Sequence, residues 1–185
     1  MPESDGTGAH GRFCAYPGST PSHKTETDTG VGNCWTDALG NCLTVHVAKT
    51  SGSKGLQVYV PLNSDVTFTE TKPFARQVAE LFERTEPDLT VARQTKSLRP
   101  GKVLIDRSQN DQHKTTVCVY SLRARDRPTV STPVEWDEVR SALASGDPHD
   151  LAFDAVQVLD RVCMRGDLLA PHLSLVQVLP QATPT

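Results

Sequence analysis

The feature that most constrains the fold is a series of short β-branched segments in the middle of the chain. Apolar and polar residues alternate in TVHVA (residues 44–48) and in LQVYV (56–60), and the polar, Gly-containing stretch between them predicts a turn. The segments LTVAR (89–93), KVLID (102–106) and TTVCVY (115–120) are also rich in β-branched residues and predict three further strands. A chain with this pattern is expected to fold around a sheet.

One amphipathic helix is expected between these strands, in the segment KPFARQVAELFER (72–84). Thr71 is suited to cap its first turn, and Pro73 is tolerated in a first turn because the N–H that it lacks has no helical partner there. The apolar side chains repeat at helical spacing and form one face, at Phe74, Val78, Leu81 and Phe82.

Two shorter helices are expected after the Pro- and Thr-rich stretch RPTVSTP. The first covers residues 135–143 and has Thr132 or Pro133 near its start. The second covers residues 154–165 and ends at Gly166, a natural helix stop. These elements predict a strand-rich centre with one crossing helix, followed by two short helices.

Length and composition are those of one globular domain. With 185 residues, 37% of them hydrophobic and 22% charged, the chain is too apolar for general disorder. No window approaches the roughly 18 apolar residues of a membrane helix, and the N-terminus lacks the features of a secretory signal. The five cysteines form no C-x-x-C pair, so neither a disulfide framework nor a zinc knuckle is expected. A cytoplasmic location and no membrane partner follow.

The chain divides into three predicted parts. Residues 1–43 are rich in Gly, Pro, Ser and Thr and predict an irregular segment, residues 44–175 form the folded domain, and residues 176–185 form a frayed tail.

The charge is distributed unevenly along the chain. Residues 49–127 carry fourteen basic and nine acidic side chains, a net +5 in a chain whose total is −3. A basic middle suits a phosphate-handling site, and a solvated surface of mixed charge is the alternative.

Three polar clusters lie at the ends of predicted strands in this basic part. The first is the turn Thr50–Gly55, where small residues let backbone N–H groups converge on an anion and Lys54 adds a positive charge. The spacing of a Walker A loop is absent and a strand follows, so an ordinary hairpin turn is the alternative.

The second cluster is Asp106, which closes an apolar strand and precedes Arg107 and Gln109. A carboxylate fixed at a strand end is a ligand of the kind that holds Mg²⁺ or Mn²⁺ against a triphosphate, although an Asp that caps a turn is the commoner case. The third cluster contains Arg123 and Arg125, which share one face of an extended chain and are suited to clamp phosphate oxygens. Surface arginines paired with acidic neighbours are the alternative.

Several motifs resemble the polymerase/primase domain of bacterial ligase D and its stand-alone relatives, within the archaeo-eukaryotic primase superfamily. They occur in the order and near the spacing of that family, from about residue 49 to about residue 170, and comprise TSGSKGLQVYVPL, TKSLRPGKVLIDRSQN, KTTVCVYSLRAR, RPTVSTPVEWDEV and RVCMRGDLLAP. The resemblance implies an α/β (α+β) primase-like palm fold with a central, mostly antiparallel sheet and flanking helices. Its N-terminal part is truncated in this chain, and residues 44–175 are the primase/polymerase-like domain.

The resemblance also implies roles for particular residues. Ser51, Gly52 and Lys54 match a loop that contacts the phosphates of the incoming nucleotide. Gln109 matches a residue near the nucleotide, and Arg123 matches an arginine that contacts its triphosphate. Asp106 matches the third metal-binding carboxylate of the family's two-metal centre, which would make it a catalytic residue with Mn²⁺ or Mg²⁺ as cofactor.

The chain departs from the family pattern at two places. Gln57 stands where many relatives have His, and it donates a hydrogen bond without carrying a proton charge. The D-x-D pair that supplies the other two metal carboxylates is absent as such. Its nearest candidate is Glu26 with Asp28, which lies only 23 residues before Ser51, a shorter connection than the family's.

Two functional hypotheses follow. The first is a primase-polymerase-type nucleotidyltransferase of non-homologous end joining, which adds nucleotides to a primer 3′-hydroxyl on DNA and acts beside a ligase and an end-binding protein. The second is a nucleotide- or DNA-binding remnant that cannot assemble the metal pair and extends primers weakly or not at all. An acid-base hydrolase has little support, because no G-x-S-x-G motif occurs.

Overall fold

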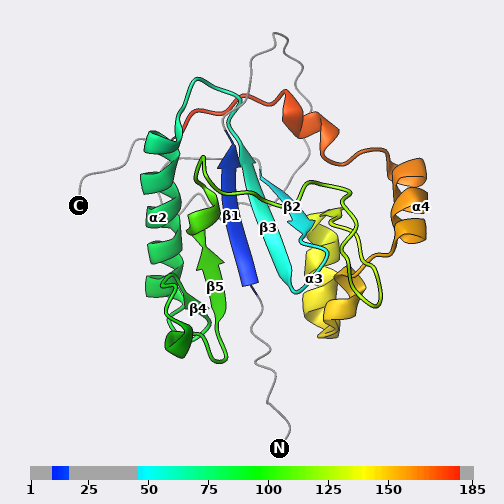
Figure 1. Cartoon of the computed structure of the whole chain (residues 1–185), viewed down its shortest axis with the longest axis horizontal. Helices are drawn as coiled ribbons and strands as arrows, with labels where there is room; N and C mark the ends of the chain where they lie inside the picture. Colours follow the sequence, from blue (N-terminus) through cyan, green and yellow to red (C-terminus); the bar gives the residue numbers. More distant parts are fainter. Residues whose placement is uncertain (1–9, 17–45, 180–185) are drawn as a thin grey trace, which may run out of the picture.

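The computed structural model describes residues 10–16 and 46–179, and a six-stranded sheet forms its centre (Figure 1). The strand order is β4-β5-β1-β3-β2-β6. The strands are β1 (His10–Tyr16), β2 (Val47–Thr50), β3 (Gly55–Pro61), β4 (Thr90–Val91), β5 (Val103–Asp106) and β6 (Pro133–Val134). The α-helices are α2 (Phe68–Thr85), α3 (Trp136–Ser145) and α4 (Ala155–Arg165), and short 3₁₀ turns are η1 (Lys96–Leu98), η2 (Arg107–Gln109), η3 (Pro148–Leu151) and η4 (Ala170–Leu173).

The sheet has an antiparallel half and a parallel half. Strand β2 pairs antiparallel with β3, as expected from the hairpin pattern, and it also pairs antiparallel with β6, a strand that the pattern did not predict. Strand β1 lies between β3 and β5 and runs parallel to both, and β4 runs parallel to β5. The expected α/β class, with a central sheet and flanking helices, is therefore confirmed, and the parallel pairs around β1 make the sheet a mixed one.

Two local expectations are wrong. Residues 1–43 were expected to be irregular, but His10–Tyr16 forms β1, which pairs with β3 over seven positions. The strand is hard to find from sequence because it shows no clean alternation and lies next to Gly- and Pro-rich stretches. The segment 115–120 was expected to be a strand, but it is irregular and ends in a turn at Tyr120, whose φ of 62° lies in the left-handed region.

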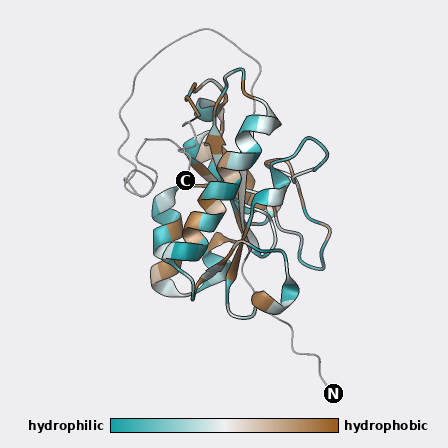
Figure 2. Cartoon of the chain, turned by 90° about the vertical axis from the view of Figure 1, so that its left-hand side faces the viewer, coloured by the Kyte–Doolittle hydropathy of each residue, from teal (hydrophilic) through white to brown (hydrophobic). Residues whose placement is uncertain are grey.

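Helix α2 supplies much of the hydrophobic core, and it begins earlier than expected. Its N-cap is Thr67 instead of Thr71, and the Glu70 carboxylate accepts hydrogen bonds from the Thr67 backbone N–H and hydroxyl. Pro73 therefore lies beyond the first turn. The side chains buried between the helix and the sheet are Val60, Leu62, Phe74, Ala75 and Val78. Figure 2 shows α2 as an amphipathic helix in front of largely hydrophobic strands.

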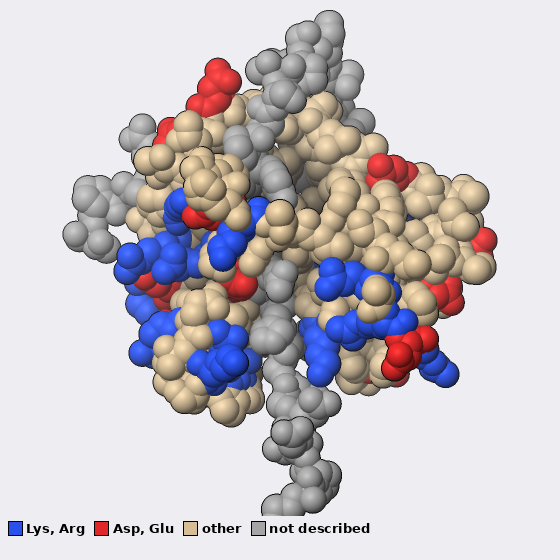
Figure 3. Space-filling model, in the orientation of Figure 1, with Lys and Arg blue, Asp and Glu red and all other residues tan. Residues whose placement is uncertain are grey.

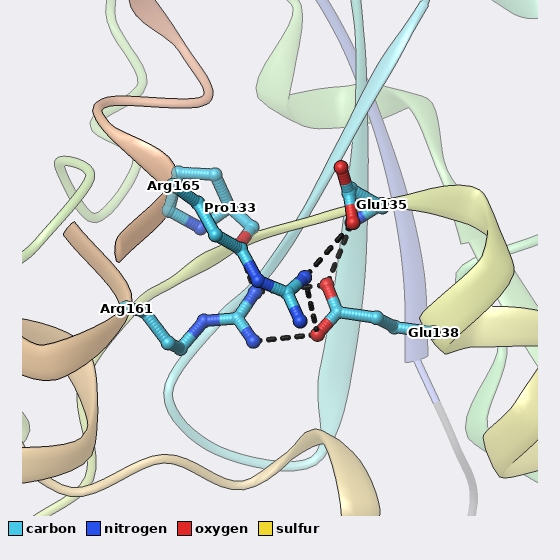
Figure 4. A network of polar contacts seen from close by, with 5 residues as sticks. All are labelled: Pro133, Glu135, Glu138, Arg161 and Arg165. Atoms are coloured by element: carbon cyan, nitrogen blue, oxygen red, sulfur yellow. Dashed lines mark hydrogen bonds and ion pairs between the residues drawn. The ribbon is translucent and has the colours of Figure 1, made fainter. Parts of the chain in front are cut away.

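Helices α3 and α4 lie on the other side of the sheet from α2 in the view of Figure 1, and ion pairs join them. Helix α3 begins after Glu135, later than the expected start near Thr132 or Pro133. The Arg161 guanidinium donates to both Glu138 oxygens, at 2.5 and 2.8 Å, and to the Pro133 carbonyl at 3.2 Å. Arg165 joins Glu135 at 2.8 Å, completing a network between β6, α3 and α4 (Figure 4).

Burial alone would raise the pKa of Glu138, but hydrogen bonds from Arg161 and from the Glu135 backbone hold that pKa below its ordinary value. None of the described helices has the length and hydropathy needed to cross a membrane.

Candidate functional site

The turn between β2 and β3 is closed by two hydrogen bonds between Ser51 and Gly55. The Ser51 backbone N–H donates to the Gly55 carbonyl at 2.7 Å, and the Gly55 N–H donates to the Ser51 hydroxyl oxygen at 3.1 Å. These two bonds close the turn at its base and leave Ser53 and Lys54 exposed at its tip. The turn therefore presents a lysine on a rigid loop of small residues.

Gly52 cannot be replaced by a larger residue without a shift in its surroundings. Its φ is +62°, and a Cβ at this position would lie 2.7 Å from Arg123 Cγ and 2.9 Å from the Ser131 backbone nitrogen. The Thr129 hydroxyl donates to the Gly52 carbonyl at 2.8 Å. The absence of a side chain at Gly52 thus lets the arginine-bearing segment pack directly against the turn.

Lys54 and Arg123 line one pocket of about 410 Å³, although 69 residues separate them in the chain. We call it the polar pocket. Arg125 reaches the same turn, where its guanidinium hydrogen-bonds the Ser53 hydroxyl. Neither Lys54 nor Arg123 has an ion pair with a carboxylate of the described residues. The pocket is lined by Ser51, Ser53, Lys54, Gly55, Thr115, Thr116, Val117, Cys118, Ser121 and Arg123.

A buried lysine fixes one wall of this pocket. Lys49 is 2% exposed, and its ammonium donates to the Val117 carbonyl at 2.9 Å and to the Ser131 hydroxyl at 2.6 Å. It also lies 5.5 Å from the centre of the Tyr59 ring. Because the 115–118 segment has no strand neighbour among the described residues, this lysine takes the place of a backbone ladder in holding it.

The turn at Tyr120 directs the chain toward Arg123. Its backbone N–H donates to the Ser131 carbonyl at 2.7 Å, and its hydroxyl donates to Asp167 at 2.6 Å. Burial and this hydrogen bond both raise the pKa of Tyr120, so the phenol stays protonated at neutral pH. Leu122 then forms a bridge with Val130, which keeps the Arg123 segment against the β2–β3 turn.

Asp106 lies at the end of β5 and is 8% exposed. One of its oxygens accepts hydrogen bonds from the Ser108 N–H at 3.0 Å, the Ser108 hydroxyl at 2.6 Å and the Gln94 amide at 2.9 Å. Asp106 therefore caps the η2 turn. This is the alternative that the sequence left open, in which the Asp caps a turn. Gln109, at the end of η2, has a buried side-chain oxygen without a hydrogen-bond partner.

The predicted site residues fall into two groups. Ser51, Gly52, Lys54 and Arg123 come together around the polar pocket, whereas Asp106 and Gln109 lie on β5 and η2 and do not line it. In the sheet, Asp106 and Gln57 are both register partners of Arg12 on β1. Two strand spacings therefore separate Asp106 from Gln57, about 10 Å between backbones. Glu26 and Asp28 lie outside the described residues.

The described residues do not form a two-metal centre. No group of three His, Cys, Asp or Glu side chains suited to an ion occurs among them. The strand beside Asp106 is β1, and its sequence HGRFCAY contains no Asp or Glu. A two-metal site needs several carboxylates around ions roughly 3.5–4 Å apart, so Asp106 alone does not supply the donor set.

Sequence reasoning missed two groups that shape the site. Lys49 and Ser131 hold the pocket wall, yet each looks like an ordinary polar residue in a strand or loop. A buried lysine at a strand position is the one signal that could have singled out Lys49, because lysine is almost never fully buried without partners. Gln57 on β3 is fully buried, and its side-chain amide nitrogen has no hydrogen-bond partner.

These features define a mixed sheet with flanking helices and a pocket lined by Lys54 and Arg123 beside the β2–β3 turn. Residues 21–169 match the family described as the LigD primase-polymerase domain. The chain therefore belongs to this family. The match begins well before residue 49, where the motifs first suggested it, and it includes Glu26 and Asp28 but not β1.

Individual relatives agree with this assignment. The chain is 50% identical over 122 residues to the multifunctional non-homologous end joining protein LigD of Mycolicibacterium smegmatis, which covers 66% of this chain and 15% of that protein. It is 34% identical over 119 residues to the bifunctional LigD of Bacillus subtilis, covering 64% and 19%. The chain thus spans less than a fifth of the length of these relatives.

A solved structure shows the same fold. The polymerase domain of Mycobacterium tuberculosis ligase D, determined in complex with DNA, superposes with a TM-score of 0.62 at 42% sequence identity. The superposition covers 69% of this chain and 42% of that one. The primase-like fold expected from the motifs is therefore confirmed. Polymerase domains of this family depend on divalent metal ions.

Proposed function

We propose that this chain binds the phosphates of nucleoside triphosphates and of DNA in the polar pocket, as a member of the end-joining polymerase family that does not extend primers. The observation that carries the proposal is the convergence of Lys54 and Arg123 on one pocket without acidic partners among the described residues. Two cations that no carboxylate of the described residues neutralises form a site for a polyanion.

Each cation suits a different part of that task. The Arg123 guanidinium offers a planar set of donors that can engage two oxygens of one phosphate, while Lys54 acts as a point charge at the tip of the turn. Ser51 and Ser53 add hydroxyl donors at the pocket wall. Because Gly52 packs against Arg123, the segment that carries Arg123 lies directly against the turn that carries Lys54.

Binding without extension follows from the donor set. Primer extension in a two-metal mechanism needs carboxylates that position both ions, and the described residues near Asp106 supply one. One oxygen of Asp106 already accepts three hydrogen bonds, two from Ser108 in the η2 turn and one from Gln94. The polar pocket needs none of these groups to attract phosphate, so binding is retained when the metal pair is missing.

The test is a titration of a fluorescently labelled nucleoside triphosphate against the wild type, Lys54→Ala and Arg123→Ala. Each change is expected to weaken binding by about 1–3 kcal/mol, the range of one charge-assisted hydrogen bond. Arg140→Ala is the matched control, because Arg140 is exposed on α3 and paired with Asp137, away from the pocket. Unchanged affinity in both pocket variants would leave the basic segment as a solvated surface.

A catalytic function is the second candidate, favoured by the position of Asp106 at a buried strand end and by the family match over Glu26 and Asp28. It predicts Mn²⁺- or Mg²⁺-dependent extension of a DNA primer-template by this chain, abolished by Asp28→Ala and by Asp106→Ala. The binding proposal predicts no such extension. A primer-extension assay with both ions therefore decides between the two.

In the cell, we infer a cytoplasmic protein that meets DNA ends together with a DNA ligase and an end-binding protein. The relatives carry names of multifunctional or bifunctional end-joining proteins, and this chain matches a small share of their length. Pull-down of ligase and end-binding activities with the tagged chain, in the presence of blunt DNA ends, tests these partners.

A further inference from the structure

A second basic area lies across the sheet from the polar pocket. In Figure 3, Lys and Arg side chains gather in two areas on the same face of the molecule, one on the side of α2 and β5 and one on the side of the β2–β3 turn. The first area contains a pocket of about 620 Å³, which we call the arginine pocket. Its lining residues are Arg76, Glu80, Glu83, Arg84, Ala92, Arg93, Gln94, Thr95, Arg107 and Ser108.

The charges of the arginine pocket do not cancel. Arg76 pairs with Glu80 at 2.6 Å, and Arg93 pairs with Glu83 at 3.2 Å, which accounts for both acidic side chains of the lining. Arg84 and Arg107 have no ion pair with any described residue. The lining residues therefore include two guanidinium groups without an ion pair and carry a net charge of +2, and the Asp106 carboxylate lies behind the wall, bound to Gln94 and Ser108.

The polar atoms around these guanidinium groups also suit an anion. Gln94, Thr95 and Ser108 bring an amide and two hydroxyl groups to the pocket wall. Gln94 and Ser108 are themselves held by hydrogen bonds to Asp106, which fixes this wall from beneath. Arg107 comes from η2 and Arg84 from the last turn of α2, so two separate elements present the two charges.

We propose that the arginine pocket is a second phosphate contact for the DNA backbone, separate from the polar pocket. The strands β5, β1 and β3 lie between the two pockets, so their walls are at least two strand spacings apart, about 10 Å. That separation is longer than one triphosphate, and the two pockets therefore take different phosphates. A nucleic-acid strand that crosses the face seen in Figure 3 offers phosphates to both at once.

The proposal rests on the proposed function in one respect, namely that nucleic acid is the polyanion this chain meets. It adds a surface that the nucleotide pocket does not need. A nucleoside triphosphate that occupies the polar pocket leaves the arginine pocket untouched, and this difference allows the two proposals to fail separately.

The test compares DNA and nucleotide binding in the double variant Arg84→Ala/Arg107→Ala. The probe is a labelled 20-nucleotide DNA, single-stranded or duplex, followed by fluorescence anisotropy at several salt concentrations. We expect roughly tenfold weaker DNA binding and a salt dependence whose slope falls by about two for the duplex, the value for two lost phosphate contacts. Affinity for the labelled nucleoside triphosphate is expected to stay unchanged.

Controls separate this result from a general effect of charge. Arg140→Ala removes one exposed arginine on α3 and is expected to leave the salt slope as in the wild type. Lys54→Ala is expected to weaken nucleotide binding. If the nucleotide affinity of this variant is unchanged, the polar-pocket proposal is wrong, and the arginine-pocket proposal is not affected. Unchanged DNA affinity and slope in the double variant overturn the proposal, as does an equal loss in Arg140→Ala. Binding of a polyglutamate peptide that requires both arginines, with no effect on DNA, would also overturn it in favour of a protein partner.

Discussion

Two arginine-containing regions of this molecule contrast in how their charges are used. At the junction of α3 and α4, Arg161 has a bidentate partner in Glu138, a carbonyl at Pro133 and the Phe153 ring 4.4 Å away. In the polar pocket, Arg123 has none of these partners among the described residues, and it faces the opening shared with Lys54. The Arg161 guanidinium binds other parts of the protein, whereas the Arg123 guanidinium is available to a ligand.

The contrast suggests a criterion for distinguishing structural from functional arginines in this protein, namely whether the guanidinium has partners within the protein. Arg161 has a side chain that is 13% exposed, and its hydrogen bond to Glu138 raises the pKa of its guanidinium despite burial. A partly buried arginine that donates to a carboxylate and a carbonyl joins neighbouring elements, and its removal leaves the carboxylate partly buried without its partner. A cation on a rigid, small-residue turn with no acidic partner contributes nothing comparable to stability, and it therefore needs another explanation.

The largest effect is expected from Arg161→Ala. Removal of this guanidinium leaves Glu138 partly buried without its main partner and also removes the contact with Phe153. We expect a loss of about 2–3 kcal/mol in the free energy of unfolding, below the range for a fully buried pair because both side chains keep some exposure. Urea denaturation measures this loss, and nucleotide affinity of the folded variant is expected to match the wild type.

A double-mutant cycle with Glu138→Ala sharpens the result. If the two residues act as one pair, the double variant loses less stability than the sum of the two single variants. Additive losses would contradict the description of Arg161 as a paired structural charge.

The next largest loss of stability is expected from Gly52→Ala, which lies beside the polar pocket and disturbs the contact between the β2–β3 turn and Arg123. The new Cβ would lie 2.7 Å from Arg123 Cγ and 2.9 Å from the Ser131 nitrogen, at a φ that L residues rarely adopt. We expect about 2 kcal/mol of lost stability from strain and overpacking together. Unlike Arg161→Ala, this change should also weaken nucleotide binding, since Arg123 must move.

Gly101→Ala provides the matched control for that prediction. Gly101 has a φ of +71°, but nothing lies within 4 Å of the position of its Cβ. It therefore reports the backbone cost alone. Equal destabilisation of the two variants, measured by thermal unfolding, would show that contact between the turn and Arg123 is unimportant.

Sequence reasoning located the polar pocket better than it located the sheet. The turn around Lys54 and the arginine at position 123 were both singled out by residue type and strand-end position, and the structure brings them together. Their convergence could not be read from spacing, because it depends on the positive φ at Gly52 and on Lys49 reaching the Ser131 hydroxyl. Such contacts join strands that are about 80 residues apart in the chain.

The errors have physical causes that differ from one segment to the next. The β-branched run at 115–120 favours a strand by propensity, but no described neighbour offers it a ladder and the chain turns at Tyr120. Strand β1 was missed because its position in the centre of the sheet comes from tertiary pairing with β3 and β5, not from its own pattern. Whether Asp106 joins other carboxylates stays a prediction, because Glu26 and Asp28 lie outside the described residues.

A smaller effect is expected from pH, and it concerns a region that neither arginine occupies. Burial lowers the pKa of His172, and burial together with His172 lowers the pKa of His46, from an ordinary value of 6.5. As the pH falls to about 6.5, the two imidazoles begin to bind protons in the unfolded chain, but they are still neutral in the folded protein. Stability is full above pH 6.5 and falls as the pH drops from 6.5 through the lowered folded-state pKa values.

The measurement is the Tm between pH 5 and pH 8 in the wild type and in His172→Asn. The variant is expected to show a weaker fall of Tm toward acid pH than the wild type. His149→Asn is the control, because His149 is exposed on η3 and should leave the profile unchanged. A wild-type Tm that rises toward pH 5.5 would contradict the predicted sign.

The smallest effect is expected from Asp106→Asn in the presence of Mn²⁺, and it tests whether the carboxylate belongs with the structural or with the available charges. Asp106 caps η2 through Ser108 and accepts from Gln94, contacts that an amide oxygen can largely keep. If Asp106 is a structural cap, Mn²⁺ shifts the Tm of the wild type and of the variant equally. A metal ligand would instead give the wild type the larger Mn²⁺ shift, because a cation that binds only the folded state stabilises it by mass action. Thermal unfolding of both proteins with and without Mn²⁺ distinguishes these outcomes, and a larger wild-type shift would place Asp106 with the available charges and favour the catalytic function over binding alone.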